Sequence, residues 1–460
     1  MTALRESLQP GGGSEPSATR RLFDRQRFGA RPGLDVTRAL LARLDDPQRE
    51  FASILIAGTN GKGSTSAVLH EILQRDGGTV ARFVSPHLTR PGERFRVGDR
   101  DADDDAVERL AAEVLPHADA VGATFFEVLV AMACLYFARA GASTAVMEVG
   151  MGGRLDATNA LDPVASAVAQ IALDHAEVLG SDLASIAREK AGVLRPGRPA
   201  WSSAEGVALD ALRSHAADLG TPLRVGARAA PGEDGPGPAR SAADATVRIA
   251  FVASDGTSFA LTHRDGRTLS LRTPMVGPAA AHNAALAACL AADLGASDAS
   301  VVAGTAAARW PGRFERVLGR TAPTRGEPLW FDGAHNPAAA AALAQVLVAL
   351  AWRPTLVLGA SQDKDVEGIA AALAPVVGTT FVTRARTSPR AEPPDRLAAR
   401  AAEAGLAVAS HHDDPREAVR AARAWATDGA PVLVAGSLYL VGELRAWWTG
   451  ETLPGWERWQ

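Results

Sequence analysis

The sequence predicts an α/β fold with a mostly parallel sheet, and three observations support this class. Along most of the 460 residues, short apolar runs typical of buried strands alternate with longer helical segments. The same alternation starts again after about residue 308, and a chain of this length exceeds one ordinary hydrophobic core. Residues 246–274 contain short alternating runs that predict a small antiparallel subdomain. We therefore expect two α/β domains, at residues 21–308 and 309–460.

The composition is typical of a soluble globular protein. Hydrophobic residues make up 47% of the chain, charged residues 22%, and the formal net charge is −4. This slightly negative net charge does not favour binding to nucleic acid or to an anionic membrane, so we expect neither partner. Cys134 and Cys289 lie in Ala-rich apolar runs and are expected to be buried thiols in a reducing compartment. Residues 1–20 lack an apolar signal-peptide core and predict a flexible tail on a cytoplasmic protein.

The first domain is expected to begin with a strand, a Gly-rich turn and a helix. The run at 124–141 is strongly apolar with few breaks, which indicates a buried helix. Strands are expected at 53–58, 79–85, 143–150 and 164–173, and helices at about 64–74 and at 281–295. Residues 225–245 are rich in Gly, Pro and Ala and predict an exposed loop.

The second domain is expected to begin near residues 308–312, where the α/β pattern restarts. An Ala-rich helix follows its first strand. Its strands are expected within 328–336, 355–360, 379–385 and 431–440.

The stretch "ILIAGTNGKGSTSAV", residues 54–68, is similar to a phosphate-binding loop but departs from G-x-x-x-x-G-K-[ST]. Ile56 stands where the first Gly belongs, and Gly63 separates Lys62 from Ser64. Glycines between a strand and a helix let several backbone N–H groups converge on one anion at the helix amino end. Lys62 is placed to reach a β- or γ-phosphate, and Ser64 or Thr65 to offer a hydroxyl to Mg²⁺. A plain strand–helix turn with a surface lysine is the less favoured alternative.

Further polar residues follow other predicted strands of the first domain. Because ligands bind outside the carboxyl ends of strands in open α/β sheets, these residues should face the same crevice as the loop. Glu148 is a candidate Mg²⁺ ligand, with an ion pair to Arg154 as the alternative. For His175, a metal or phosphate role is slightly favoured over a packed or surface residue. Lys190 precedes a helix end, and its residue context alone favours a solvated cation.

The motifs of the whole chain resemble one known family. "GTNGKGS", "SPHL", "TFFE", "EVGMGGRLDATN", "DHAEVLG", "HNAALA", "WPGRFE", "DGAHN" and "DKD" occur in this order between about residues 22 and 445. Together they closely resemble folylpolyglutamate synthase/dihydrofolate synthase, a branch of the Mur ligase superfamily. The resemblance implies a central domain with a Mur-ligase-type P-loop, a C-terminal Rossmann-like domain, and ATP in the cleft between them.

The resemblance also implies roles for individual residues. ATP would be bound by Gly58, Thr59, Asn60, Gly61, Lys62, Gly63, Ser64, Thr65, Asn283, Arg313 and Asp332. Two Mg²⁺ ions would be held by Ser64, Ser85, Glu148, His175 and Lys190. The family lysine that matches Lys190 is carbamylated, which replaces the solvated-cation interpretation with an anionic oxygen ligand.

For the other substrates, the resemblance implies contacts from both domains. Phe126, Asp156 and the neighbouring Arg154 match the pteridine pocket. For Phe126, a role in packing the hydrophobic core is an equally supported alternative. His335 and Ser437 match positions near the incoming glutamate or the ATP. The catalytic set would be Lys62, Lys190, Asp332 and His335. One departure is the segment "VGPAAAHNAAL", in which the family's Arg or Gln upstream of Asn283 is absent or replaced by His282.

The resemblance implies an ATP-dependent ligase that adds L-glutamate to a folate or dihydropteroate carboxylate through an acyl phosphate, releasing ADP and phosphate. We expect a monomer with small-molecule substrates. A peptidoglycan-type Mur ligase is the alternative enzyme, although that branch typically carries a G-K-T-T loop. A P-loop switch protein is the alternative outside enzymes, but it would not need Glu148, His175 and Lys190. The sequence leaves the choice between the folate acceptors open.

Overall fold

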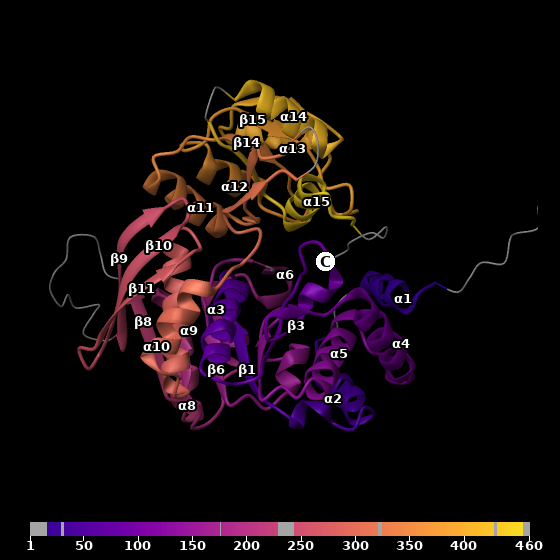
Figure 1. Cartoon of the computed structure of the whole chain (residues 1–460), viewed down its shortest axis with the longest axis vertical. Coiled ribbons are helices and arrows are strands. Elements are labelled where there is room, and N and C mark those ends of the chain that lie inside the picture. The colour runs from indigo at the N-terminus through magenta and orange to yellow at the C-terminus, as the bar shows by residue number, and fades with distance from the viewer. Residues whose placement is uncertain are drawn as a thin grey trace, which may run out of the picture.

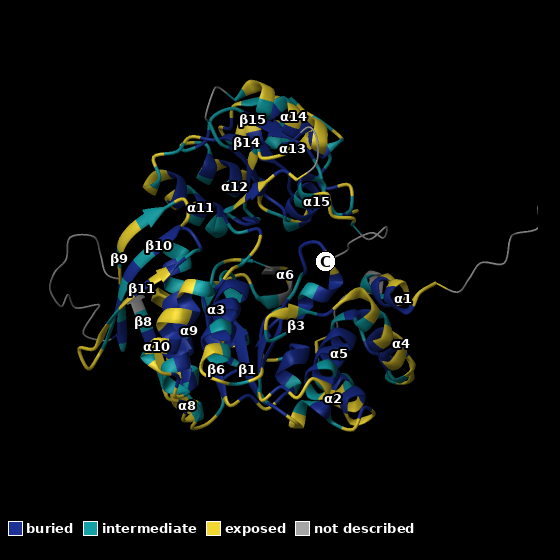
Figure 2. Cartoon of the chain, viewed as in Figure 1, coloured by how far each residue is buried: buried dark blue, intermediate teal, exposed yellow. Residues whose placement is uncertain are grey.

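The computed structural model describes residues 16–28, 32–174, 176–228, 243–320, 324–426 and 430–453. These residues form two lobes, each built on its own β-sheet (Figure 1). The described part of the first lobe carries eleven strands and that of the second lobe six. Each sheet is covered by helices whose buried sides face the strands and whose exposed residues face outward (Figure 2). The predicted α/β class is confirmed.

Parallel strands form the centre of the first sheet, with β1 (Ala52–Ala57) between β5 (Thr144–Glu148) and β6 (Ala165–Val168). The sheet continues in parallel through β2 (Val80–Phe83) on one side and through β7 (Ala200–Ser202) and β8 (Leu223–Arg228) on the other. Antiparallel strands β3 (Phe95–Val97) and β4 (Arg100–Asp101) close one edge. The four strands predicted for this domain are present, although the last was predicted too long, because β6 ends at Val168 and not at residue 173.

The predicted antiparallel meander is also present, as β9 (Ala245–Ala253), β10 (Gly256–His263) and β11 (Thr268–Thr273). It does not form a sheet of its own, because β9 pairs in parallel with β8 and so extends the large sheet. Most of the loop predicted at 225–245 lies outside the described residues, and its first residues belong to β8.

The two faces of β1 bury alternate side chains in different cores, as the two-residue period of a strand requires. Ile54 and Ile56 pack with α3 and α9, whereas Leu55 and Ala57 pack in the cluster that contains α5. The α-helices of this lobe are α1 (Ala18–Asp24), α2 (Asp35–Ala42), α3 (Lys62–Arg75), α4 (Asp104–Val121), α5 (Phe125–Arg139), α6 (Ala176–Leu179), α7 (Leu183–Ala191), α8 (Gly206–Leu219), α9 (Pro278–Asp293) and α10 (Asp298–Ala307). Short 3₁₀ helices span Arg25–Phe28, Pro47–Arg49, Pro91–Arg94 and Ala157–Ala160.

The prediction of a flexible tail over residues 1–20 is wrong for its last residues, which belong to helix α1. Helix α1 begins at Ala18 because the Glu108 carboxylate accepts hydrogen bonds from the backbone N–H groups of Ala18 (2.6 Å) and Thr19 (2.9 Å). A carboxylate at a helix amino end satisfies donors that lack intrahelical partners. Residues 1–15 lie outside the described part of the chain.

The second sheet has the order β12-β13-β17-β14-β15-β16, in which β12 alone runs antiparallel to its neighbour. Its strands are β12 (Glu315–Leu318), β13 (Pro328–Phe331), β14 (Thr355–Leu358), β15 (Thr380–Val382), β16 (Val408–His411) and β17 (Val432–Ala435). Its helices are α11 (Pro337–Ala349), α12 (Val366–Leu373), α13 (Pro394–Glu403), α14 (Pro415–Trp425) and α15 (Leu438–Thr449). The strands predicted at 328–336 and 431–440 were too long, because Asn336 caps helix α11 and Ser437 caps helix α15.

The chain passes from one sheet to the other between the end of α10 at Ala307 and the start of β12 at Glu315. The domain limits near residue 308 stay a prediction, in agreement with this crossing. Cys134 and Cys289 are both buried free thiols. Among the described residues, no helix is long and apolar enough to cross a membrane.

Candidate active site

A cavity of about 1160 Å³ lies between the lobes and takes its wall from both of them. The first lobe contributes the loop at 58–64, Glu148 and the segment at 150–157. The second lobe contributes Arg313 and residues near His335. Residues predicted to bind one substrate therefore meet here from both halves of the chain.

Each glycine of the loop sits where a side chain would collide with a neighbour. A Cβ on Gly58 would lie 2.9 Å from the Cβ of Ala169, and φ is +143°. A Cβ on Gly61 (φ +91°) would overlap the Asn283 side chain, and one on Gly63 would overlap the Trp310 indole. Helix α3 begins at the next residue after Gly61, so its amino end opens into the loop. The predicted strand–loop–helix arrangement is confirmed.

The polar side chains of the loop are held close to its backbone. The Lys62 Nζ donates to the carbonyls of Gly58 and Thr59, both at 3.2 Å. Ser64 Oγ donates to the Gly61 carbonyl (3.1 Å) and accepts from Asn283 Nδ2 (2.9 Å). Asn283 therefore joins α9 to the loop, and its predicted contact with ATP stays a prediction.

Thr65 differs from the rest of the predicted loop set. Its side chain is fully buried in α3, and it is not among the residues that line the cavity. Its backbone N–H donates to the Gly61 carbonyl at 2.9 Å, which closes the first turn of the helix. The prediction that Thr65 binds ATP or offers a hydroxyl to Mg²⁺ therefore has no support in this geometry.

Glu148 ends β5 and is 5% exposed, facing the cavity. Its Oε2 accepts the backbone N–H of Ser85 at 3.3 Å, so both candidate metal ligands lie together. Burial raises the pKa of the Glu148 carboxyl, and the nearby Lys62 and Arg313 oppose this rise. The alternative ion pair with Arg154 is wrong, because Arg154 donates to Glu189 at 2.8 and 3.2 Å.

His175 lies outside the described residues, so its predicted place beside Glu148 is not described. Within the described ranges, no three or more His, Cys, Asp or Glu side chains gather in a way that could hold a metal ion. The predicted ligand set contains serine hydroxyls and His175 besides Glu148, so it remains a prediction.

Lys190 on α7 is buried, with 3% of its surface exposed. Its Nζ donates to the Gly58 carbonyl at 2.8 Å, which places the amine beneath the glycine loop. Burial, together with the neighbouring charge of Lys62, lowers the pKa of Lys190 to about 7. The solvated cation that the residue context favoured is therefore wrong.

In the second lobe, the Asp332 carboxylate accepts hydrogen bonds from two separate backbone segments. Its Oδ2 accepts the N–H of Phe314 and its Oδ1 that of Ala334, both at 2.8 Å. Burial raises the pKa of the Asp332 carboxyl, and Arg313 opposes the rise. Both carboxylate oxygens are thus bound to the main chain, next to Arg313.

His335 is neutral in this setting. Burial lowers the pKa of its imidazole to about 4, helped by the charges of Arg313 and Lys364. Its Nδ1 lies 2.8 Å from the carbonyl oxygen of Gly333. A neutral imidazole that donates from Nδ1 presents Nε2 as an acceptor.

Comparisons with known proteins show the family to which this chain belongs. A family model described as "Mur ligase, glutamate ligase domain" matches residues 312–438. A probable bifunctional folylpolyglutamate synthase/dihydropteroate synthase of Haloferax volcanii is 39% identical over 450 residues, which are 94% of this chain and 50% of the relative. The dihydrofolate synthase/folylpolyglutamate synthase of Bacillus subtilis is 30% identical over 92% of this chain and 96% of its own length. The chain belongs to the folylpolyglutamate synthase/dihydrofolate synthase family.

Solved structures of this family share the fold. The folylpolyglutamate synthase of Mycobacterium tuberculosis, complexed with ADP and AMPPCP, superposes with a TM-score of 0.81 at 32% identity and covers 95% of this chain and 98% of its own. A bifunctional folylpolyglutamate synthase/dihydrofolate synthase with Mn, AMPPNP and L-glutamate bound has a TM-score of 0.78 at 30% identity, covering 94% and 98%. The chain spans about half the length of the Haloferax volcanii relative.

The residues expected at the pteridine pocket differ in their burial and in their contacts. The Phe126 ring is partly buried, lines the cavity and packs 5.9 Å from the ring of Phe83. Asp156 is buried and accepts from the N–H groups of Met151 (2.9 Å) and Thr158 (3.0 Å), so it shapes its own loop. Arg154 lies at the cavity wall with its side chain half exposed.

Ser437 and His282 also line the cavity. Ser437 Oγ accepts the N–H of Leu440 at 3.5 Å and so caps α15. His282 Nδ1 lies 2.7 Å from the Pro278 carbonyl, one turn back on α9. Asn283 contacts Ser64 despite the departure from the family pattern in the residues upstream of it.

Sequence reasoning missed a polar network that joins the lobes. Asn60 and Asn336 exchange amide hydrogen bonds of 3.1 and 3.3 Å, and Asn336 also donates to Asp174 at 3.1 Å. Lys364 Nζ donates to the other Asp174 oxygen at 2.8 Å. Asn336 and Lys364 belong to the "DGAHN" and "DKD" motifs, but no pattern in the sequence indicates partners so far away.

Proposed function

We propose that this protein is an ATP-dependent carboxylate–amine ligase. It adds L-glutamate to the carboxylate of a folate or of dihydropteroate and releases ADP and phosphate. The observation that carries this proposal is the shared cavity, which Lys62 and Glu148 line from one lobe and Arg313 and His335 from the other. The ADP, ATP analogues and L-glutamate named for the solved relatives support the same substrates.

The first chemical step is phosphoryl transfer, because a carboxylate is a poor acyl donor. The γ-phosphoryl group of ATP passes to the acceptor carboxylate, which forms an acyl phosphate and leaves ADP. The N–H groups of the glycine loop, Lys62 and Arg313 oppose the charge that develops on the transferring oxygens, so catalysis is mainly positioning and electrostatics. Lys62 exchanges its contacts with the loop carbonyls for the phosphates.

Magnesium fits the chemistry of the donor set. Glu148 offers a buried carboxylate beside the loop, and Ser64 lines the same cavity, so hard oxygen ligands face the phosphate position. We propose that Ser64, Ser85, Glu148, His175 and a carbamylated Lys190 hold two Mg²⁺ ions. When bound, the ions neutralise phosphate charge.

The pKa of about 7 supports carbamylation of Lys190, because a large fraction of the amine is neutral near pH 7. The neutral amine attacks CO₂, a C–N bond forms, and one proton is released. A carbamate signal in the ¹³C NMR spectrum of protein treated with ¹³C-bicarbonate tests this, with Lys190→Gln as the control. No signal in the unmutated protein would rule the modification out.

In the second step, the amino group of L-glutamate attacks the acyl phosphate and phosphate leaves. Both oxygens of Asp332 are bound to backbone N–H groups, so we assign the acceptor role for the amine to Nε2 of His335. Ser437 lies at the same cavity and is proposed to contact the glutamate. Phe126 is proposed to contact the pteridine, while Asp156 and Arg154 shape the wall around it.

We also infer a monomer that acts in the cytoplasm. Its two buried free thiols, Cys134 and Cys289, fit a reducing compartment. Size-exclusion chromatography with light scattering tests the monomer.

The first test of the function is phosphate release from ATP with Mg²⁺ and L-glutamate, comparing dihydropteroate with tetrahydrofolate as acceptor. Mass spectrometry of the products should show the added mass of one glutamate. Activity with both acceptors would make the enzyme bifunctional, and activity with one would fix its substrate. If neither acceptor stimulates ATP use and a uridine-linked muropeptide does, the folate assignment is wrong.

A further inference from the structure

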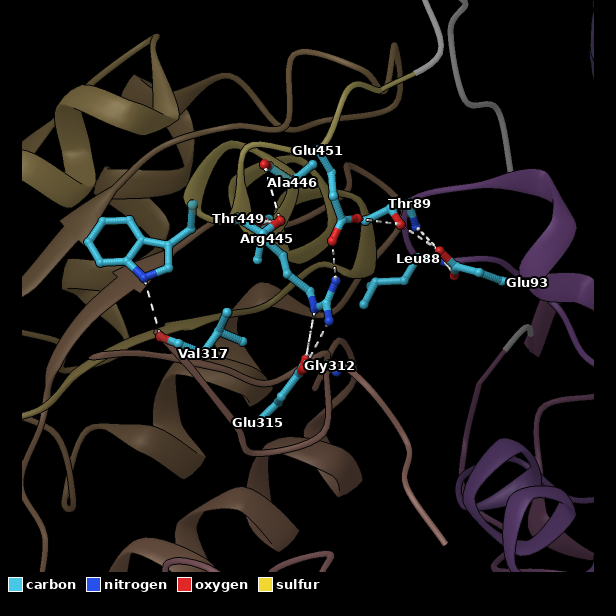
Figure 3. Close-up of polar contacts among 11 residues, drawn as sticks. Leu88, Thr89, Glu93, Gly312, Glu315, Val317, Arg445, Ala446, Thr449 and Glu451 are labelled. Atoms are coloured by element: carbon cyan, nitrogen blue, oxygen red, sulfur yellow. Dashed lines mark hydrogen bonds and ion pairs between the residues drawn. The ribbon is translucent and has the colours of Figure 1, made fainter. Parts of the chain in front are cut away.

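A chain of polar contacts outside the cavity joins the two lobes (Figure 3). Arg445 on α15 donates from Nε to Glu315 Oε2 (3.0 Å) and from Nη2 to Glu315 Oε1 (3.1 Å). Its Nη1 contacts Glu451 at 3.5 Å, and Glu451 Oε2 lies 3.3 Å from Thr89 Oγ1, whose one proton is shared between Glu451 and the nearer Glu93 Oε1 at 2.5 Å. In Figure 3, Arg445 lies between the two glutamates, with Thr89 on the far side of Glu451. We call these four residues the clasp.

One end of the clasp reaches the segment that carries Ser85. Thr89 follows Ser85 by four residues, and Ser85 donates its N–H to Glu148 at 3.3 Å. Glu93 fixes the segment, because its carboxylate accepts the N–H groups of Leu88 (2.6 Å) and Thr89 (3.0 Å) (Figure 3). The clasp therefore contacts the first lobe through an ordered segment and not through a free surface side chain.

The other end fixes the backbone next to Arg313. Glu315 Oε2 accepts the N–H of Gly312 at 2.8 Å, and the Gly312 carbonyl accepts the N–H of Gly333 at 2.8 Å. The flanking residues Gly312 (φ +74°) and Phe314 (φ +43°) are both in the left-handed region. A non-glycine residue in this region is strained, and the conformation persists only where the surrounding contacts hold it. The turn that carries Arg313 therefore depends on its hydrogen bonds.

We propose that Glu315 and Arg445 are positioning residues that hold the Gly312–Phe314 turn so that Arg313 points at the phosphates of ATP. The inference rests on the proposed function. Glu315 is shared between the turn and Arg445, and Arg445 fixes the orientation of the carboxylate through two parallel hydrogen bonds. The side chains of Arg445 and Glu315 are only 19% and 23% exposed, so solvent screens this pair less than an open surface pair. Glu451 and Thr89 tie the same arginine to the first lobe.

The test measures binding of AMPPCP with Mg²⁺ by calorimetry, and kcat and KM for ATP. Arg445→Met should weaken AMPPCP binding about tenfold, since a charge-assisted bidentate contact is lost. Arg445→Lys restores the charge without the paired geometry and should recover only part of the loss. Arg400→Met is the matched control, because Arg400 makes a similar paired contact to Glu367 (2.7 and 2.7 Å) in the same lobe, away from the turn. It should bind AMPPCP normally.

A double-mutant cycle separates positioning from general destabilisation. If Arg445 acts through Arg313, Arg445→Met should have no further effect on AMPPCP binding in an Arg313→Ala background. Additive losses, or normal binding by Arg445→Met, would overturn the proposal. A protein that binds no AMPPCP before mutation would instead refute the proposed function, so the two failures can be told apart.

Discussion

The burial of the Lys190 amine beneath the glycine loop can be tested through the pH dependence of protein stability. In the folded protein the pKa of Lys190 is lowered from 10.5 to about 7, first by burial and then by the charge of Lys62. In the unfolded chain the amine has its ordinary pKa. The unfolded state therefore binds more protons than the folded state between about pH 7 and 10.5. The free energy of unfolding should rise with pH across this window.

The expected size follows from the two pKa values. With 7 for the folded and 10.5 for the unfolded amine, the Lys190 contribution to stability should increase by about 2 kcal/mol from pH 7 to pH 9. Lys190→Met removes this titration and leaves every other ionisable group in place. It also removes the hydrogen bond to the Gly58 carbonyl, and this second loss should lower stability equally at every pH, so it leaves the pH dependence unchanged.

The assay is urea unfolding of both proteins at pH 7, 8 and 9 in CO₂-free buffer, because carbamylation would replace the amine. The stability difference between the unmutated protein and Lys190→Met should grow with pH in favour of the lysine protein. Arg400→Met serves again as a control whose difference stays constant with pH. Parallel pH profiles for the lysine and methionine proteins would show that the amine is solvated, and the reasoning from burial would fail.

Other predictions concern the loop and one buried histidine. Lys62→Ala should lower kcat at least 100-fold with an unchanged circular dichroism spectrum, because its folded-state contacts are to carbonyls of its own loop; near-normal turnover would contradict the mechanism. Gly63→Ala should lower stability by about 1–3 kcal/mol in thermal unfolding, because the new Cβ would overlap the Trp310 ring; an unchanged Tm would mean that the ring is free to move. Burial lowers the pKa of His70 from 6.5 to about 3, so the folded state binds fewer protons and stability should fall as pH drops from 6.5 toward 3. His70→Gln should weaken this fall in urea unfolding, and an equal fall in both proteins would contradict the cause.

The fold was predictable where one local rule determined each element. The short apolar runs at β1, β5 and β6 predicted buried strands, and the glycines after β1 predicted the sharp entry into α3. Errors arose where a distant side chain decided the outcome. Glu108 stabilises the start of α1 from 89 or more residues away, and no pattern near Thr19 indicates this contact. The place of the antiparallel strands in the large sheet likewise depends on β8, whose pairing partner follows residues that predict only a loop.

The residues of the site also differ in whether a local pattern in the sequence could predict them. Residue type and position after a strand were enough to predict that Lys62 and Glu148 lie at one cavity, because ligands of open α/β sheets bind outside the carboxyl ends of the strands. They were not enough for Lys190, whose context predicts a solvated cation and whose chemistry is set by burial beneath a loop 132 residues away. Arg445 extends this argument. Its sequence context is an ordinary helix, and its proposed role exists only because α15 places it between Glu315 and Glu451. On this proposal, activity should depend as much on residues that hold Arg313 and the loop in place as on the groups that a motif can name.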